Sequence, residues 1–152
     1  MKFKITQQIF EKFPDLSIGT VTARDVDNRG RSEEIIASIR EREKEIRQIL
    51  TAETLSQQPR IGAWRRAYSL FGAKPIKYKS SVEGLYRMIL KGMELRPINK
   101  IVDIYNFVSI KHMIPVGGDD LKKVEDDITL TLARGGEPGV FILNQEGTEI
   151  EL

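Results

Sequence analysis

The sequence predicts a fold with both helices and strands, and two patterns in its 152 residues support this prediction. Apolar residues recur at the spacing of one helix face between Ser32 and Thr51, and again between Asn99 and Ser109. Short segments that are rich in β-branched residues, or that alternate apolar with polar residues, lie towards both ends of the chain. With 40% hydrophobic and 30% charged residues, the composition is that of an ordinary soluble protein, and the length suits one domain, residues 1–152.

The composition excludes several kinds of chemistry. The chain has no cysteine, which excludes disulfides, thiolate metal sites and a cysteine nucleophile. The single histidine, His112, cannot form a multi-histidine metal site, and we expect neither a metal ion nor another cofactor. No apolar run has membrane-spanning length, and the N-terminal residues lack the apolar segment of a signal peptide. We therefore expect a cytoplasmic protein without membrane contact.

The first thirty residues are predicted to form short elements. Residues 2–5 are expected to be a strand, residues 5–13 a helix ended by Pro14, and residues 16–23 a second strand. Residues 25–30 have the composition of a turn.

The clearest helix spans residues 32–51. Ser32 is a natural N-cap, and Glu33 and Glu34 suit the positive end of the helix dipole. The basic residues of this helix are interleaved with glutamates, which is typical of a solvated face rather than of an RNA contact.

Another helix is predicted from Pro59 onward, with Gly72 as its C-terminal stop. Trp64, Tyr68 and Phe71 recur at helical spacing, which favours a place in the core over a stacking platform. Between positions 60 and 79 the chain has six basic residues and no acidic one: Arg60, Arg65, Arg66, Lys74, Lys77 and Lys79. This basic patch suits a phosphate backbone, because cations displace condensed counterions, but such charge also occurs on surfaces that bind no nucleic acid.

Ser80 and Glu83 have the spacing of a capping box, in which each side chain pairs with a backbone N–H group of the other's residue. The box is expected to open a helix over residues 82–91, which ends at Gly92. We interpret the serines as caps rather than nucleophiles, since no base partner is evident.

The segment 99–120 is the candidate site. Asn99 is expected to cap a helix here. The expected apolar face of this helix comprises Ile101, Val102, Ile104, Tyr105 and Val108. Asp103 and Asn106 are three residues apart, so their side chains lie close on the helix surface. A turn at Gly117-Gly118 is expected to bring backbone N–H groups beside this polar edge. The pattern fits a pocket wall, and it also fits a core helix that ends in an ordinary turn.

The C-terminal part is predicted to contain strands. Asp120 is expected to cap a short turn over residues 121–124. Strands are predicted for residues 128–132, 140–143 and 148–152, with a loop at 134–139.

An ordered series of residues from about position 60 to about position 140 resembles the B3/B4 domain of the phenylalanyl-tRNA synthetase β subunit, and more closely the free-standing proteins built on it. The matching residues are Trp64-Arg65, Tyr68, Phe71-Gly72, Lys74-Pro75, Ser80-Ser81, Gly84-Leu85, Lys91-Gly92, Pro97 to Asn99, Val102 to Ser109, Pro115, Gly117-Gly118, Asp120 and Gly136-Glu137. The resemblance implies an α+β domain with a β-sandwich-like core flanked by helices. In the synthetase this domain hydrolyses mischarged tRNA, and the free-standing relatives look like editing enzymes that act in trans. The implied partner is therefore mischarged aminoacyl-tRNA, not DNA.

The resemblance also implies roles for single residues. Asn106 matches the family's pocket asparagine, which would hold the substrate carbonyl or orient the attacking water. Glu137 matches the pocket glutamate, which would pair with the substrate's ammonium group or with that water. Apart from the resemblance, Asn106 fits an amide that satisfies backbone groups, and Glu137 fits a solvated loop residue.

Gly117 and Gly118 are expected to offer backbone N–H groups to the developing oxyanion. Asp103, Asp120 and Tyr105 are expected at the substrate-binding edge, the two aspartates through hydrogen bonds to backbone. The six residues of the basic patch are expected to contact the RNA.

The sequence departs from the family in two ways. Gly117 stands where the synthetase domain has a pocket histidine, and the chain ends at Leu152, whereas family members usually continue well beyond Gly136-Glu137. We therefore expect a C-terminus that is truncated relative to the family. Both departures favour an alternative, a non-catalytic tRNA- or protein-binding module on the same fold. A third candidate is a small-molecule ester hydrolase, against which a steep fall of affinity with salt would count.

Overall fold

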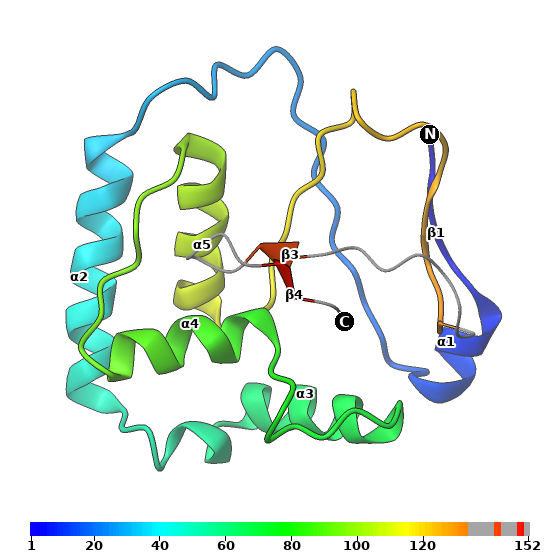
Figure 1. The fold of residues 1–152 in the computed structure, drawn as a ribbon, viewed down its shortest axis with the longest axis horizontal. Coiled ribbons are helices and arrows are strands. Elements are labelled where there is room, and N and C mark those ends of the chain that lie inside the picture. The colour runs from blue at the N-terminus through cyan, green and yellow to red at the C-terminus, as the bar shows by residue number, and fades with distance from the viewer. Residues whose placement is uncertain (134–141, 144–148, 151–152) are drawn as a thin grey trace. The chain divides into compact units, whose positions relative to one another are not determined.

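The structure is a computed structural model that describes residues 1–133, 142–143 and 149–150. The chain divides into two compact units, one formed by residues 1–17 with 125–152 and the other by residues 18–124 (Figure 1). Each unit is described by itself, and a single domain over residues 1–152 stays a prediction.

The larger unit, residues 18–124, is helical. Its elements are α2 (Glu33–Ile49), the 3-10 helix η1 (Leu55–Gln57), α3 (Pro59–Leu70), α4 (Ser81–Leu90) and α5 (Lys100–His112). Helix α2 packs against α5 and α4, and α4 also packs against α5 (Figure 1). One apolar core joins these helices, and its buried members are Ile39, Ile46, Leu55, Ile61, Val82, Tyr86, Ile89, Leu95 and Ile110.

Three of the expected helix ends are confirmed. Ser32 caps α2 by accepting from the Ile35 N–H group, and Asn99 caps α5 by accepting from the Val102 N–H group at 3.0 Å. Gly72 takes a positive φ of 92° after α3. Its N–H group donates to the Ser69 carbonyl and the next N–H group donates to the Tyr68 carbonyl, which is the glycine-terminated helix end that the sequence predicts.

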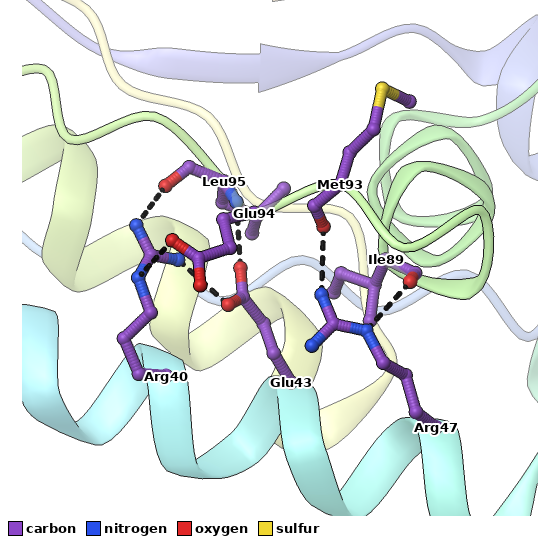
Figure 2. A network of polar contacts seen from close by, with 7 residues as sticks. All are labelled: Arg40, Glu43, Arg47, Ile89, Met93, Glu94 and Leu95. Atoms are coloured by element: carbon purple, nitrogen blue, oxygen red, sulfur yellow. Dashed lines mark hydrogen bonds and ion pairs between the residues drawn. The ribbon is translucent and has the colours of Figure 1, made fainter.

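A buried carboxylate fastens the segment between α4 and α5 to α2 (Figure 2). Glu43, fully buried on α2, accepts from the Leu95 N–H group at 2.6 Å and from Arg40 at 2.7 Å. Arg40 in turn donates to the Leu95 carbonyl and pairs with Glu94. One turn further along α2, Arg47 donates to the carbonyls of Ile89 and Met93. Glu43 and Arg40 together satisfy the N–H and carbonyl groups of Leu95, a residue that is only 3% exposed.

The smaller unit contains the described strands. Strand β1 (Phe3–Ile5) pairs in parallel with β2 (Ile128–Leu130), with Lys4 opposite Thr129, and α1 (Gln7–Lys12) follows β1. Strand β3 (Ile142–Leu143) pairs antiparallel with β4 (Glu149–Ile150). The described residues therefore confirm a mixed fold of helices and small sheets, with described strands inside the ranges predicted for residues 2–5, 128–132, 140–143 and 148–152.

The strand predicted for residues 16–23 is wrong. These residues form no strand in the structure, and the side chain of Val21 is 97% exposed. β-branched residues favour a strand only where a neighbouring strand supplies hydrogen bonds and packing. Among the described residues no strand pairs with this segment.

The predicted apolar face of α5 is also wrong in part. Ile101 and Ile104 are 37% and 46% exposed, whereas Asp103, Ser109 and Ile110 are buried. The sequence of α5 is apolar on several sides, so periodicity alone did not determine which side meets the core. Asp103 can be buried because one of its carboxylate oxygens accepts from the Ile98 N–H group at 2.9 Å.

Candidate functional site

The polar edge of α5 starts from its N-terminus. Besides Asn99, the side chain of Asn28 accepts from the Ile101 N–H group at 2.9 Å, so two backbone donors of the first turn are satisfied by asparagines. Lys100 lies 3.5 Å from a carboxylate oxygen of Asp27, next to Asn28 in the chain. The role of Asn28 was missed at the sequence level, because it depends on a contact between positions 73 residues apart.

Asp103 and Asn106 present two different polar groups. Asp103 is 1% exposed, and its Oδ1 accepts from the Ile98 N–H group, but its Oδ2 has no hydrogen-bond partner among the described residues. Asn106, one helical turn further along, is half-buried, and its side chain makes no hydrogen bond within the described residues. The alternative role of Asn106, an amide that only satisfies backbone groups, is therefore not seen among the described residues. Its amide is available to donate to or accept from a ligand.

Tyr105 and Gly118 lie side by side. A Cβ atom added to Gly118 would be 3.6 Å from Cε1 of Tyr105, an ordinary van der Waals distance. The chain returns towards the helix here because Met113 adopts the left-handed conformation and the Ser109 hydroxyl donates to the Ile114 carbonyl at 2.6 Å. Burial raises the pKa of Tyr105, and the negative charge of Asp103 raises it further, so the phenol stays protonated and able to donate at neutral pH.

The turn predicted at Gly117-Gly118 is wrong. Neither Gly117 nor Gly118 has a positive φ, and residues 114–120 form no regular turn. A Cβ atom on Gly117 would meet nothing within 4 Å. Their N–H groups nevertheless donate to no acceptor within the described residues, which leaves both groups available to an anionic oxygen.

Asp120 and Glu137 complete the predicted set. Asp120 is exposed and accepts from the Lys122 N–H group at 3.0 Å, which confirms the predicted cap of the following turn. Glu137 and the rest of the predicted loop at 134–139 lie outside the described residues. The structure therefore brings Gly118 against Tyr105, and it does not test the distance from Asn106 to Glu137.

The basic patch divides into two groups. Arg60 donates to the His112 carbonyl, and Arg65 forms an ion pair with Glu83 at 2.8 Å. Arg66 and the three lysines of the patch form no ion pair with any described acidic residue. Three of the six predicted RNA contacts are thus engaged within the protein, because the Lys79 ammonium group also donates to the Ile76 carbonyl. Only Arg65 forms an ion pair with a described acidic residue.

The predicted capping box is wrong in its bonding. Ser80 occupies the N-cap position of α4 with an extended backbone, but its hydroxyl makes no capping hydrogen bond and is buried without a partner among the described residues. Glu83, 1% exposed, instead accepts at 2.8 Å from Arg65 and from Arg87. Two guanidinium groups offer a buried carboxylate stronger, charge-assisted hydrogen bonds than one backbone N–H group does. The spacing of Glu83 and Arg87, one helical turn, was the signal that could have indicated this pair.

Metal binding and membrane insertion receive no support from the described residues. Residues 1–133, 142–143 and 149–150 contain no group of three or more histidine, aspartate or glutamate side chains that could hold a metal ion. No helix in this part of the chain is long and apolar enough to cross a bilayer.

The comparisons with known proteins agree with the sequence resemblance. Residues 63–152, more than half of the chain, match the B3/4 domain, and the chain belongs to this family. The β subunit of phenylalanine–tRNA ligase from Fusobacterium nucleatum is 41% identical over 64 residues, which cover 42% of this chain and 8% of the subunit. The corresponding subunit from Nitrobacter winogradskyi is 39% identical over 70 residues, 46% of this chain and 8% of the subunit. The chain thus matches only a small part of these relatives, and no solved structure matches it.

Proposed function

We propose that this chain is a trans-acting editing hydrolase that deacylates mischarged tRNA in the cytoplasm. The observation that carries the proposal is the B3/4 match over residues 63–152, because it includes Asn106, Gly117, Gly118 and Glu137. The relatives are subunits of a ligase whose name specifies tRNA, and five basic residues of the patch, which have no described acidic partner, suit an RNA backbone. The proposal includes a single domain with the family's β-sandwich-like core.

The reaction needs little from the protein beyond positioning. Water attacks the ester carbonyl carbon, the carbon–oxygen bond to the ribose breaks, and the products are a free amino acid and a tRNA with both terminal hydroxyls restored. The Asn106 amide orients the water or holds the carbonyl, and Glu137 binds the ammonium group of the amino acid or accepts a proton from the water. The N–H groups of Gly117 and Gly118 stabilise the oxyanion. Tyr105 and Asp120 form the substrate-binding edge beside these groups, and Asp103 supports this edge from within through its hydrogen bond to the Ile98 N–H group.

Because Gly117 stands at the position of the family's histidine, the groups that transfer the proton are Glu137 and the ribose hydroxyl next to the ester. Hydrolysis should therefore remain active without a titrating imidazole. The same substitution is the observation that favours the second candidate, a module on this fold that binds tRNA or protein without cleaving it.

The test is deacylation of a panel of mischarged tRNAs by the purified protein, with Asn106→Ala and Glu137→Ala as variants. Loss of an oxyanion donor or a general base costs about 10²-fold to 10⁴-fold in rate. We expect losses in this range for one aminoacyl-tRNA, with Asn28→Ala as a control that alters an asparagine bonded only to backbone. If no mischarged tRNA is cleaved while tRNA still binds at low salt, the binding module replaces the hydrolase. If small amino acid esters are cleaved as fast as aminoacyl-tRNA, the third candidate, a small-molecule ester hydrolase, replaces the editing hydrolase.

A further inference from the structure

The loop after α3, residues 72–79, is a folded turn rather than an extended connection. Its start is held by the two hydrogen bonds that end α3 at Gly72. The N–H groups of Lys77 and Tyr78 both donate to the Lys74 carbonyl at 2.9 Å, and the Lys79 ammonium group donates to the Ile76 carbonyl at 2.7 Å. These internal bonds give the loop a defined surface in the absence of any ligand.

That surface contains an open hollow of about 470 Å³. Its volume lies in the range of small-ligand sites, about 300–1,000 Å³. The hollow is bounded by Gly72, Lys74, Pro75, Ile76 and Lys77, among others, and its walls are mostly apolar. A mostly apolar wall favours a flat apolar group over a sugar or a phosphate.

Exposed apolar residues lie within or next to the chain segment that lines the hollow, and Ile76 is part of its wall. Ile76 is 83% exposed, Leu70 59%, Phe71 43% and Tyr78 39%. A group of exposed apolar side chains within nine residues is unusual for a surface that meets only water, and it marks a site of interaction. The Phe71 ring is supported from within by Tyr68, with 4.9 Å between ring centroids.

The charge at this loop is of one sign. Lys74, Lys77 and Lys79 pair with no described acidic residue, and neither does Arg66 on α3. Lysines that flank an apolar hollow with exposed rings match a polyanion whose subunits carry flat aromatic faces. A duplex offers its phosphates but keeps its bases stacked inside, so it would leave the rings and the hollow unused.

We propose that the loop 72–79 with Phe71 is a binding site for unpaired RNA nucleotides, in which a base occupies the hollow or stacks on Phe71 and neighbouring phosphates contact Lys74 and Lys77. The inference rests on the proposed function for its natural ligand, since tRNA carries its amino acid on a single-stranded end. It narrows the RNA contacts from six basic residues to Lys74 and Lys77. Arg65 is paired with Glu83, and Arg60 and Lys79 donate to backbone carbonyls. The guanidinium group of Arg66 lies towards Gly62 on α3.

The test is fluorescence anisotropy with a labelled single-stranded RNA of roughly 12 nucleotides, its duplex, and an acidic peptide of equal charge. The variants are Lys74→Glu with Lys77→Glu, and Phe71→Ala. The matched control is Lys44→Glu with Lys91→Glu, two exposed lysines that form no ion pair with described residues. Circular dichroism establishes that each variant is folded.

We expect the single strand to bind about tenfold more tightly than the duplex, and Phe71→Ala to weaken it by about tenfold without changing the salt dependence. The double lysine reversal should weaken binding further and reduce the slope of log affinity against log salt by about 1.4, or about 0.7 for each phosphate that is no longer neutralised by a lysine. The control should leave both quantities unchanged. Equal binding of duplex and single strand, equal binding of the acidic peptide, or an equal loss in the control would overturn the proposal. Because the RNA strands carry no amino acid, this outcome is independent of whether the protein hydrolyses aminoacyl-tRNA.

Discussion

Replacing Glu43 with alanine should destabilise the unit of residues 18–124 by about 3 kcal/mol, because hydrogen bonds to a charged group contribute about 1.5–3 kcal/mol each and Glu43 accepts two of them. The Leu95 N–H group would be left buried without an acceptor. Arg40 is 23% exposed and keeps its bonds to the Leu95 carbonyl and to Glu94, so water and these partners offset part of the second loss (Figure 2). Losses of about 3–5 kcal/mol are usual when one member of a buried ion pair is removed.

Urea unfolding monitored by the fluorescence of Trp64, the single tryptophan, measures this effect in the correct unit. With a urea dependence of about 2 kcal/mol per molar, the midpoint should fall by about 1.5 M. Glu43→Gln keeps an oxygen that can accept from Leu95 and loses only the charge, so it should cost about 1–2 kcal/mol. Glu45→Ala removes an ion pair with Arg42 in which Glu45 is 52% exposed, and it should cost no more than about 0.5 kcal/mol.

Unfolding of Glu43→Ala at the same urea concentration as Glu45→Ala, with an unchanged slope, would contradict this prediction. That result would mean that Glu43 contributes nothing measurable and that apolar contacts and the bonds from Arg40 and Arg47 hold the segment between α4 and α5 to α2.

Three further predictions concern caps, a buried hydroxyl and acid stability. Asn99→Ala should lower the free energy of unfolding in urea by about 1 kcal/mol because the Val102 N–H group loses its acceptor. Gln58→Ala is the control, since Gln58 precedes α3 without a capping bond. An equal loss in the control would contradict the capping role of Asn99. Tyr86→Phe should cost about 1–2 kcal/mol, because the Tyr86 hydroxyl donates to the Ile110 carbonyl at 2.6 Å within the core. Burial raises the pKa of Tyr86. The stability that depends on the phenol proton is therefore complete below the unfolded-state pKa of about 10 and is lost as the pH rises through the pKa of the folded state. An alkaline absorbance titration in which Tyr86→Phe removes an early-titrating phenol would contradict this. The hydrogen bond from Lys4, and after it that from the Lys2 N–H group, lowers the pKa of Asp127. The contribution of Asp127 to the β1–β2 pairing is therefore present above its unfolded-state pKa and is lost as the pH falls through the pKa of the folded state. The protection factors of the Thr6 and Ile128 amides, which correct for the slower intrinsic exchange in acid, should fall as the pH falls in the wild type and not in Asp127→Asn. A pH dependence that is the same in both proteins would contradict the role of Asp127.

Most of the helix boundaries could be predicted because the signals that determine them are local. Ser32, Asn99 and Gly72 act on backbone groups within a few residues of themselves, and the structure confirms each of them. The turn at Asp120 follows the same rule. Such signals depend only on the chemistry of neighbouring residues and survive any arrangement of the rest of the chain.

The wrong predictions concern residues that could interact either with a local partner or with a distant one. Glu83 had the spacing to cap its own helix, and it pairs instead with Arg65, which packing brings to it. The strand expected at residues 16–23 depended on a neighbouring strand that no local pattern can supply.

For the candidate site, the sequence by itself indicated the family, and the family model matches residues 63–152, the range that contains Asn106, Gly118 and Glu137. The roles of these residues stay predictions. Only the tertiary structure decided that Asp103 faces the core, that Gly118 lies against Tyr105, and that Arg60 and Arg65 are bound within the protein. The physical reason is that the side chain alone determines the polarity of a residue, whereas its burial and its partners depend on which distant segments fold against it.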